Sequence, residues 1–305
     1  MGLYIIGRVY QTALVLFGVS AVVFLLLHIS GDPAALLLPQ DATKESIEQF
    51  RHAHGFDQPL YIQFYRFLAG AVRGDLGNSL KFNQPALSLV LERFPATLEL
   101  ALAALVISIV TGIPLGIISA MKRNSPLDTA AMVVSMLGQS IPAFWLGIMM
   151  ILLLSVKWQI FPPFGRGGIS HLILPAISLS TWSAARVARL TRSGMIEVLG
   201  QEYIRTARAK GLANVVVVQR HALKNAMLPI ITVLGLDLGG FLGGAVITET
   251  IFAWPGAGQL AMQSIYSRDY PVVQATVLLV ASGYVLINLV VDVTYAYLNP
   301  RIRFG

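Results

Sequence analysis

The chain of 305 residues is 55% hydrophobic and only 12% charged, with 22 lysines and arginines against 15 acidic residues. In soluble domains about a quarter of the residues are charged. A chain as apolar as this one must therefore expose much of its surface to something other than water. The absence of cysteine excludes disulfides, thiolate catalysis and cysteine-ligated metal sites.

Six stretches are apolar enough to cross the hydrocarbon core of a membrane, which takes about 20 residues of helix. In chain order they cover residues 9–29, 98–120, 130–156, 172–187, 226–248 and 272–295. Their apolar runs are continuous, which indicates helices and not the alternating strands of a membrane barrel. The sequence therefore predicts an all-α integral membrane protein with six transmembrane helices.

The first stretch could be a signal peptide or a retained span. It follows a basic residue, Arg8, but its apolar run is longer than the core of a signal peptide. The sequence HISGDPAA after it offers no cleavage site of small residues. We therefore predict a retained span.

Lysine and arginine indicate the orientation, because short cytoplasmic loops are enriched in them. If the N-terminus is cytoplasmic, the inner segments hold Arg8, Lys122, Arg123, Arg186, Arg189, Arg192, Arg205, Arg208, Lys210, Arg220, Lys224, Arg301 and Arg303. The short outer loops hold only Lys157, Arg166 and Arg268. Both termini are thus predicted to be cytoplasmic. The excess of basic over acidic residues reflects the membrane topology and attraction to anionic lipid. We therefore expect no nucleic-acid partner.

The largest connection, 30–95, is predicted to be an extracytoplasmic helical segment. Thr43 suits the N-cap of a first helix that Gly55 ends, and Pro59 suits the first turn of a second helix that Gly74 ends. Apolar residues recur along both at helical spacing. The pattern favours a helical pair that rests against the bundle or in the outer interface, with a docking surface for an external partner as the less favoured alternative.

Prolines and glycines mark the spans themselves. Pro114, Pro142 and Pro175 interrupt the second, third and fourth spans, and each frees a backbone carbonyl. Glycines four residues apart let helix backbones approach closely in lipid. They are Gly112 and Gly116 in the second span and Gly235, Gly239 and Gly243 in the fifth.

Three acidic residues lie in or near the spans, where a carboxylate is costly and therefore a functional candidate. Asp237 lies in the middle of the fifth span, and Glu249 and Asp292 lie close enough to span ends to reach polar surroundings. Asp237 and Glu249 are candidates for the translocation path. A structural pairing with an arginine or a free carbonyl is equally open for each.

Several catalytic signatures are missing from the sequence. No glycine-lysine dipeptide occurs, so there is no Walker A loop for nucleotide phosphates. Neither H-E-x-x-H nor G-x-S-x-G occurs, and His52 and His54 are spaced so that they point to different faces of a helix. We expect no enzymatic activity, no catalytic or metal-binding residues and no bound cofactor.

The cytoplasmic loop over 186–225 is the longest on that side. Glu202 falls in the first turn of a short helix, Arg208 and Lys210 fall in its last turn, and Gly211 provides a left-handed stop. Residues 215–225 predict a second short helix that leads into the fifth span. A solvated basic loop and a docking helix both fit, and the two well-terminated helices favour docking.

Tyr203, Thr206, Ala207 and Lys210 share one face of the first helix. Because Ala207 and Ala209 are small, another protein surface could approach the helix closely.

The stretch EYIRTARAKGL resembles the cytoplasmic loop signature, or EAA loop, of permease subunits in binding-protein-dependent ABC importers. With HALKNAMLP after it, it is similar to the dipeptide, oligopeptide and nickel branch. Further stretches resemble that branch along nearly the whole chain: HISGDP, GFDQPLY, RGDLGNSL, SIPAFWLG, ARLTRSGM, ITETIFAWPGAGQL, RDYPVVQA and NPRIRF. The general signature has an acid and two alanines where this chain has Arg205, Thr206 and Ala207, a departure typical of the branch.

The resemblance implies a type I ABC importer permease fold, with 1–305 as a single transmembrane permease domain in a bacterial inner membrane. It implies a heterodimer with a second homologous permease, one or two cytoplasmic ATPases that carry ATP and Mg²⁺, and an extracytoplasmic solute-binding protein. The ATPase-coupling helix would comprise Glu202, Tyr203, Arg205, Thr206, Ala207, Arg208, Lys210 and Gly211.

The resemblance makes di- or oligopeptides the leading solute class, with nickel chelates, glutathione and opine-like compounds as alternatives. A different class of function is an autonomous ion-coupled transporter that uses Asp237 as its ion site. No inverted repeat is evident to support that class. A membrane scaffold without transport is a third possibility.

Overall fold

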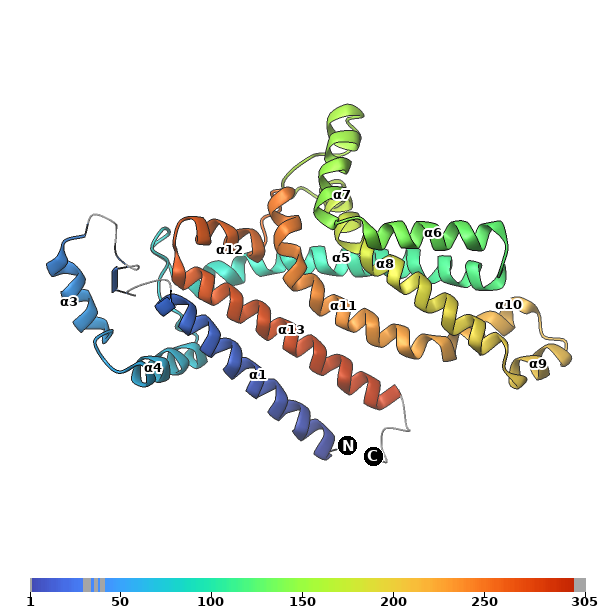
Figure 1. Cartoon of the computed structure of the whole chain (residues 1–305), viewed down its shortest axis with the longest axis horizontal. Coiled ribbons are helices and arrows are strands. Elements are labelled where there is room, and N and C mark those ends of the chain that lie inside the picture. Colours follow the sequence, from blue (N-terminus) through green and yellow to red (C-terminus); the bar gives the residue numbers. More distant parts are fainter. Residues whose placement is uncertain (1, 30–33, 36–37, 39–41, 299–305) are drawn as a thin grey trace.

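A computed structural model of the chain describes residues 2–29, 34–35, 38 and 42–298 (Figure 1). Within these residues the protein is all-helical, and its extended pairing is an isolated antiparallel bridge between Asn78 and Pro85. The predicted all-α class is therefore confirmed. The NPRIRF stretch at the C-terminus and the SGDP part of HISGDP lie outside the described residues.

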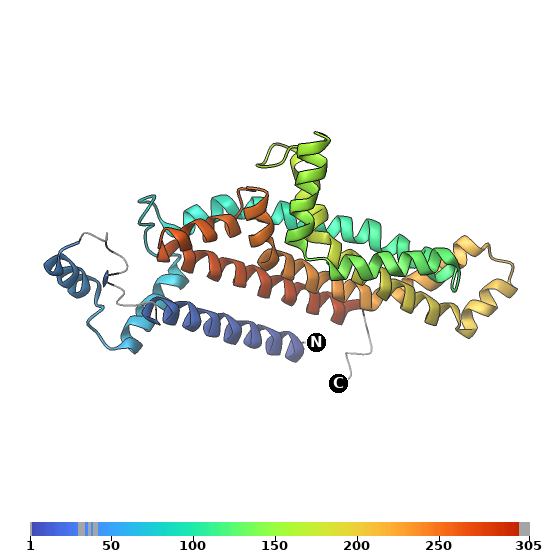
Figure 2. The ribbon, with the colours of Figure 1, turned by 45° about the horizontal axis from the view of Figure 1, so that its top comes forward.

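Long apolar helices form the body of the molecule. Among the described residues, α1 (Gly2–Ile29), α5 (Ala86–Met121), α11 (Leu223–Ile251) and α13 (Tyr270–Leu298) are long and apolar enough to cross a membrane. In Figure 1, α5 runs along the long axis of the molecule, whereas α1, α11 and α13 cross it obliquely and side by side; in Figure 2 all four run close to that axis. The first, second, fifth and sixth predicted spans are thus confirmed as membrane-length helices.

The third predicted span is not a continuous helix, which corrects the expectation for 130–156. The chain forms α6 (Pro126–Ser140), then α7 (Ala143–Met150) and a π-helical segment (Ile151–Lys157), with a bend of 100° between the two halves. The break falls before Pro142, because a residue that precedes proline avoids the helical conformation. Ile141 accordingly has extended backbone angles.

The fourth predicted span lies within α8 (Ile169–Leu199), which has 31 residues. This helix continues past 187, so the first part of the predicted loop over 186–225 is helix and not loop. Arginines along α8 keep it out of the set of apolar helices. The described residues therefore provide four membrane-length apolar helices, or five if the bent pair is one span, and the count of six remains a prediction.

The core of the bundle is the pair α5 and α8, which form the most extensive contact between two helices of the described chain. Gly112 and Gly116 permit this contact. A Cβ on Gly116 would lie 2.5 Å from the backbone oxygen of Ala188, and one on Gly112 would lie 2.7 Å from that of Ala184. The predicted role of these glycines in close helix packing is confirmed.

The outer segment carries two capped helices, α3 (Lys44–His54) and α4 (Leu60–Arg73). The Thr43 hydroxyl accepts a hydrogen bond from the backbone N–H of Ser46, and Gly55 and Gly74 end the helices in the left-handed conformation, as predicted. Pro59 is the N-cap of α4, one residue before the predicted position.

Of the predicted helical pair, α4 rests against the bundle, whereas α3 lies away from it at the end of the molecule (Figure 1). Phe64 of α4 packs edge-on against Phe17 and Phe24 of α1, with ring centroids 5.5 and 5.3 Å apart. Residues 86–95 belong to α5 and not to the segment between the helices.

Candidate functional site

The α9 helix (Glu202–Ala209) lies at the end of the molecule opposite to α3 and α4 (Figure 1). Its inner face consists of Ile204 and Ala207, which are buried in a cluster with Met195 and Val217. Ala207 therefore packs against this chain's own core. The expectation that another protein approaches the small side chain of Ala207 is therefore wrong, whereas Ala209 is exposed.

The other face of α9 is exposed and charged. Its exposed residues are Glu202, Tyr203, Arg205, Thr206, Arg208, Ala209 and Lys210. Glu202 lies in the first turn and Arg208 in the last, as predicted, whereas Lys210 is the C-cap, one residue beyond the helix. None of the four charged residues on this face forms an ion pair within the described part of the chain. Their charges are available to a partner.

Gly211 forms the corner that follows α9. Its φ of 78° is left-handed, as predicted, and a Cβ there would meet nothing within 4 Å. The chain then passes through α10 (Asn214–Val216) and a π-helical turn (Val217–Ala222) directly into α11. The helix predicted over 215–225 is therefore not separate but begins the long helix, because no residue in it breaks the helical path.

Three arginines follow one another at every third position along α8: Arg186, Arg189 and Arg192. Each bonds to a side chain of a neighbouring helix: Arg186 to α11, and Arg189 and Arg192 to α6. The arginines thus link α8 to the two helices that flank it.

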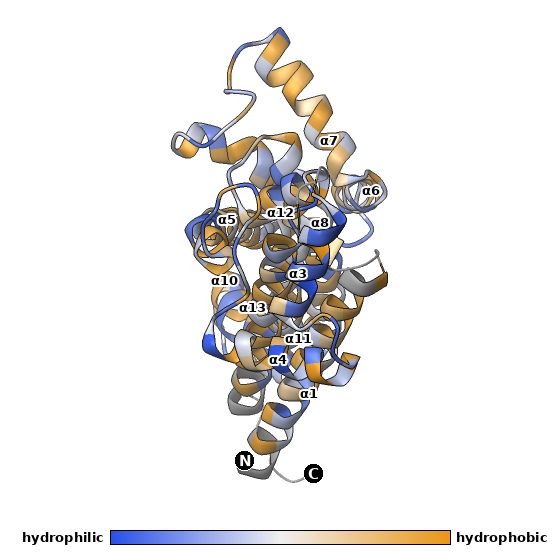
Figure 3. Ribbon diagram, turned by 90° about the vertical axis from the view of Figure 1, so that its left-hand side faces the viewer, coloured by the Kyte–Doolittle hydropathy of each residue, from blue (hydrophilic) through white to orange (hydrophobic). Residues whose placement is uncertain are grey.

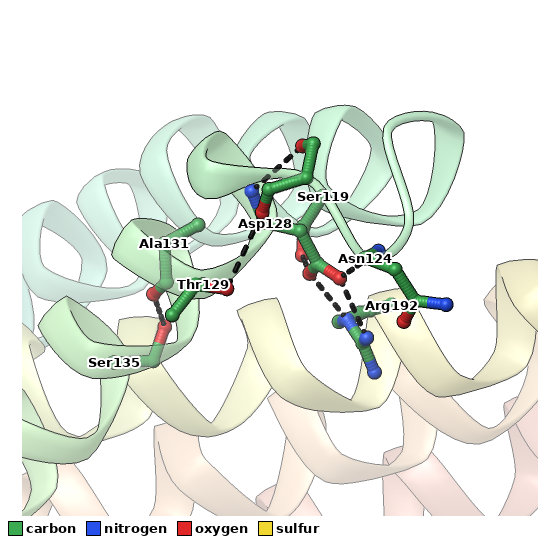
Figure 4. Close-up of polar contacts among 8 residues, drawn as sticks. Ser119, Asn124, Asp128, Thr129, Ala131, Ser135 and Arg192 are labelled. Atoms are coloured by element: carbon green, nitrogen blue, oxygen red, sulfur yellow. Dashed lines mark hydrogen bonds and ion pairs between the residues drawn. The ribbon is translucent and has the colours of Figure 1, made fainter.

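Arg192 forms a bidentate ion pair with Asp128 near the start of α6 (Figure 4). Its Nε lies 2.7 Å from Oδ1 and its Nη2 lies 2.8 Å from Oδ2. The Ser119 hydroxyl of α5 and the backbone N–H of Asn124 also donate to this carboxylate. The cluster joins α5, α6 and α8 just before α9.

Reversing the charges of this pair tests its role. Asp128→Arg or Arg192→Asp alone is expected to lower the unfolding midpoint of the purified protein, because each leaves two like charges in contact. The double reversal is expected to recover part of the loss. Arg123→Gln, an exposed cation of the same turn, is the control and should change little. Equal midpoints for single and double variants would contradict the pairing.

Asp237 is buried and has two partners. It accepts a hydrogen bond from the Ser183 hydroxyl at 2.6 Å and pairs with Arg186 Nη1 at 3.1 Å. The sequence leaves open whether Asp237 lines the translocation path or pairs with an arginine or a free carbonyl. In the structure Asp237 pairs with an arginine. Arg186 was expected among the cytoplasmic residues, but the pair places its guanidinium beside the apolar stretch of α11, and the ring of Trp182 lies 5.2 Å from it.

Glu249 is fully buried inside the bundle, and the polar groups around its carboxylate belong to the protein. Its carboxylate accepts hydrogen bonds from the Thr97 hydroxyl at 2.6 Å and from the backbone N–H of Gln259 at 2.9 Å. Gln259 lies in the first turn of α12 (Ala257–Tyr266), and Thr97 also accepts from the N–H of Ala257 at 2.9 Å. Side chains of α5 and α11 therefore supply the cap that α12 lacks.

Two further carboxylates hold the ends of the bundle together. Asp292 pairs with Arg8 of α1 at 3.0 Å. Asp269, at the start of α13, is fully buried and accepts hydrogen bonds from the Ser79 hydroxyl and the backbone N–H of Leu80. The sequence gives no local signal for Asp269, because its partners lie about 190 residues earlier.

No group of three or more histidine or acidic side chains in the described ranges is arranged to hold a metal ion. The charged side chains that the structure brings together are the arginines of α8 and the carboxylates of α6 and α11, and the exposed face of α9 lies beyond the end of α8.

Two family models match the chain. "Binding-protein-dependent transport system inner membrane component" matches residues 112–304, and the corresponding N-terminal model matches residues 1–101. The glutathione transport system permease protein GsiC of Escherichia coli O6:H1 is 43% identical over 302 residues, 99% of each chain. The dipeptide transport system permease protein DppB of Escherichia coli K12 is 40% identical over 98% of each chain.

The fold also resembles solved structures. An inward-facing MetNI methionine ABC transporter matches with a TM-score of 0.59 and 22% identity, over 69% of this chain and 96% of the other. A second crystal form of that transporter gives the same TM-score at 20% identity.

Proposed function

Because the chain belongs to the family of binding-protein-dependent transport system inner membrane components, we propose the following assembly and coupling for it. The protein is a permease subunit of an ATP-driven importer for peptides or related small solutes, and it is a multi-pass protein of a bacterial inner membrane. The finer points are its six-span topology, its partners, its coupling helix and its solute.

The proposed topology has six spans with both termini in the cytoplasm. The bent pair of α6 and α7 is the third span and α8 is the fourth. The support is twofold: α8 is long enough to cross although its arginines make it less apolar, and the short connections on the α9 side carry most of the cations.

The proposed coupling helix is α9, which contacts a cytoplasmic ATPase. The assembly contains one or two such ATPases, and they bind ATP and Mg²⁺. The single observation that carries this proposal is the way in which α9 packs against the rest of the chain. Ile204 and Ala207 fix the helix to the chain's own core, while the residues of the opposite face are exposed and have no ion-pair partner in the described chain. Because α9 is fixed in this way, a displacement of α9 by the ATPase would also move α8.

Gly211→Val tests the coupling role. The left-handed conformation at this position disfavours a β-branched residue by about 1 kcal/mol or more. Solute uptake by the assembled transporter is therefore expected to fall severalfold, with membrane insertion intact. Gly211→Asn is the matched control and should retain more uptake, since asparagine tolerates this conformation. Normal uptake by the valine variant at normal expression would contradict the proposal.

The proposed second permease is supported by the α7 segment. This segment projects away from the bundle (Figure 2), and its helix is strongly hydrophobic (Figure 3). Phe144 and Trp145 are about half exposed on it. An apolar arm that leaves its own bundle inside the membrane needs another surface to cover it, and a homologous permease in a heterodimer supplies one, with lipid covering the remainder.

The proposed solute is a small peptide, because two relatives that cover almost the whole chain are permeases for glutathione and for dipeptides. Nickel chelates and opine-like compounds remain the alternatives. A solute-binding protein on the outer side would deliver it, near the segment that carries α3 and α4. An autonomous transporter with Asp237 as its ion site is less well supported, because Arg186 and Ser183 already occupy that carboxylate.

Purification of the tagged chain from its native membrane in mild detergent tests the assembly. Mass spectrometry is expected to find a second permease and one or two Walker-containing ATPases in stoichiometric amounts. A well-folded chain that purifies alone would contradict the proposal.

A further inference from the structure

One face of α8 is exposed although the helix lies in the middle of the bundle. Trp182, Arg186, Arg189 and Ser193 follow at spacings of four, three and four residues, so they share this face. Trp182 is 46% exposed and the Arg186 side chain 32% exposed. The opposite side of α8 packs against α5.

The depth of this face follows from what the arginines contact. Arg186 bonds to Asp237, which lies within the apolar stretch Pro229–Ile251 of α11. Arg189 bonds to Gln139, next to the last residue of α6, where that helix breaks inside the proposed third span. A charged group that faces hydrocarbon at such a depth costs several kcal/mol. The face therefore borders a water-filled path or another protein.

The charges along this face do not balance. Three arginines of α8 bond to only two carboxylates, because Asp128 pairs with Arg192 and Asp237 pairs with Arg186. The remaining cation, Arg189, bonds to the neutral side chain of Gln139, and no carboxylate of the described chain contacts it. The exposed face thus presents one uncompensated positive charge.

The two arginines on the face are also held in place. Arg186 is fixed by Asp237 through Nη1 and lies over the ring of Trp182, which leaves its other N–H groups without a protein partner in the described residues. Gln139 fixes Arg189 through Nη2. Guanidinium groups that are oriented in this way suit a planar carboxylate, which they bind with paired hydrogen bonds.

We propose that Arg189, with Arg186 beside it, binds the free carboxylate of the solute as it passes through the membrane. The proposal rests on the proposed function, under which a peptide with a C-terminal carboxylate is the solute. The site selects for solutes with an anionic end. It lies where the bent pair, α8 and α11 meet, far from the exposed face of α9.

The natural absence of cysteine permits a direct test in the assembled transporter in membrane vesicles. Trp182→Cys places a thiol one turn from Arg186 at depth, and Ser193→Cys is a second reporter that replaces a side chain of similar size. The modification rate is measured with a negatively and a positively charged methanethiosulfonate reagent of similar size. Both reporters are expected to react, with the anionic reagent favoured.

Arg189→Gln added to either reporter is expected to lower the ratio of anionic to cationic rates severalfold, while Arg189→Lys retains it. Dialanine is expected to slow modification by the anionic reagent, and less so with glutamine at 189. In uptake assays, Arg189→Gln should raise the KM for dialanine about tenfold or more, as expected for a lost hydrogen bond between charged groups.

Two outcomes would overturn the proposal. If neither reporter reacts, the face is sealed by lipid or by the second permease. If both react but the rate ratio does not depend on Arg189, the face is wet without selecting anions. Co-purification of the ATPases with these same variants shows separately whether the proposed function holds, so the two proposals fail in different ways.

Discussion

Glu249→Ala is expected to destabilise the protein more than any other single replacement of a carboxylate in the chain. The variant removes the acceptor for the buried Thr97 hydroxyl and for the N–H of Gln259, and it leaves a cavity under α12. Unsatisfied buried donors and a cavity together cost roughly 3 kcal/mol or more. The unfolding midpoint in detergent, followed by size-exclusion chromatography after heating, should fall clearly.

Glu249→Gln keeps one oxygen acceptor and should lie between the wild type and the alanine variant. Thr250→Ala is the matched control, since the hydroxyl of this exposed neighbour donates to the carbonyl of Val246 in its own helix. A midpoint for Glu249→Ala equal to that of the control would show that the cap of α12 contributes little.

Gly116→Ala is expected to push α5 and α8 apart. Its Cβ would lie 2.5 Å from both the backbone oxygen of Ala188 and the Cβ of Thr191, and neither atom can move without shifting the helix. Overpacking of this kind costs typically about 1 to 3 kcal/mol. We expect a lower unfolding midpoint and reduced ATPase association, because α8 carries α9 at its end.

The same substitution at Gly18 of α1 is the control, because a Cβ there would meet nothing within 4 Å. In an open helical position alanine replaces glycine with a gain of up to about 1 kcal/mol. If the unfolding midpoint rises for Gly18→Ala and falls for Gly116→Ala, the loss at Gly116 is due to packing and not to helix propensity. Equal effects would contradict the role of Gly116 in the α5–α8 contact.

Local signals in the sequence predicted the local structure well. Thr43 caps α3, and Gly55, Gly74 and Gly211 end their segments in the left-handed conformation. Each of these outcomes depends on the backbone preference of one residue and on neighbours within a single turn, so the sequence carries the information directly. Apolar runs likewise located the four long helices.

Long-range pairings could not be predicted in this way. Thr97 and Glu249 are 152 residues apart, and Arg186 and Asp237 are 51 apart. A lone carboxylate in an apolar run predicts that some partner exists, but the identity of that partner depends on which helices pack together. Pro142 signalled an interruption, yet the bend of 100° depends on where α7 finds contacts.

The continuity of α8 has a mechanical consequence under the proposed function. Its closest approach to α5 lies at Ala184 and Ala188, so this contact acts as a fulcrum. At about 1.5 Å per residue, the arm toward the outer end is roughly 26 Å long and the arm toward α9 is roughly 20 Å. An unbroken lever of these proportions turns a sideways step of α9 into a larger step in the opposite direction at the outer end. A single rotation of α8 would then close the pathway on one side of the membrane and open it on the other.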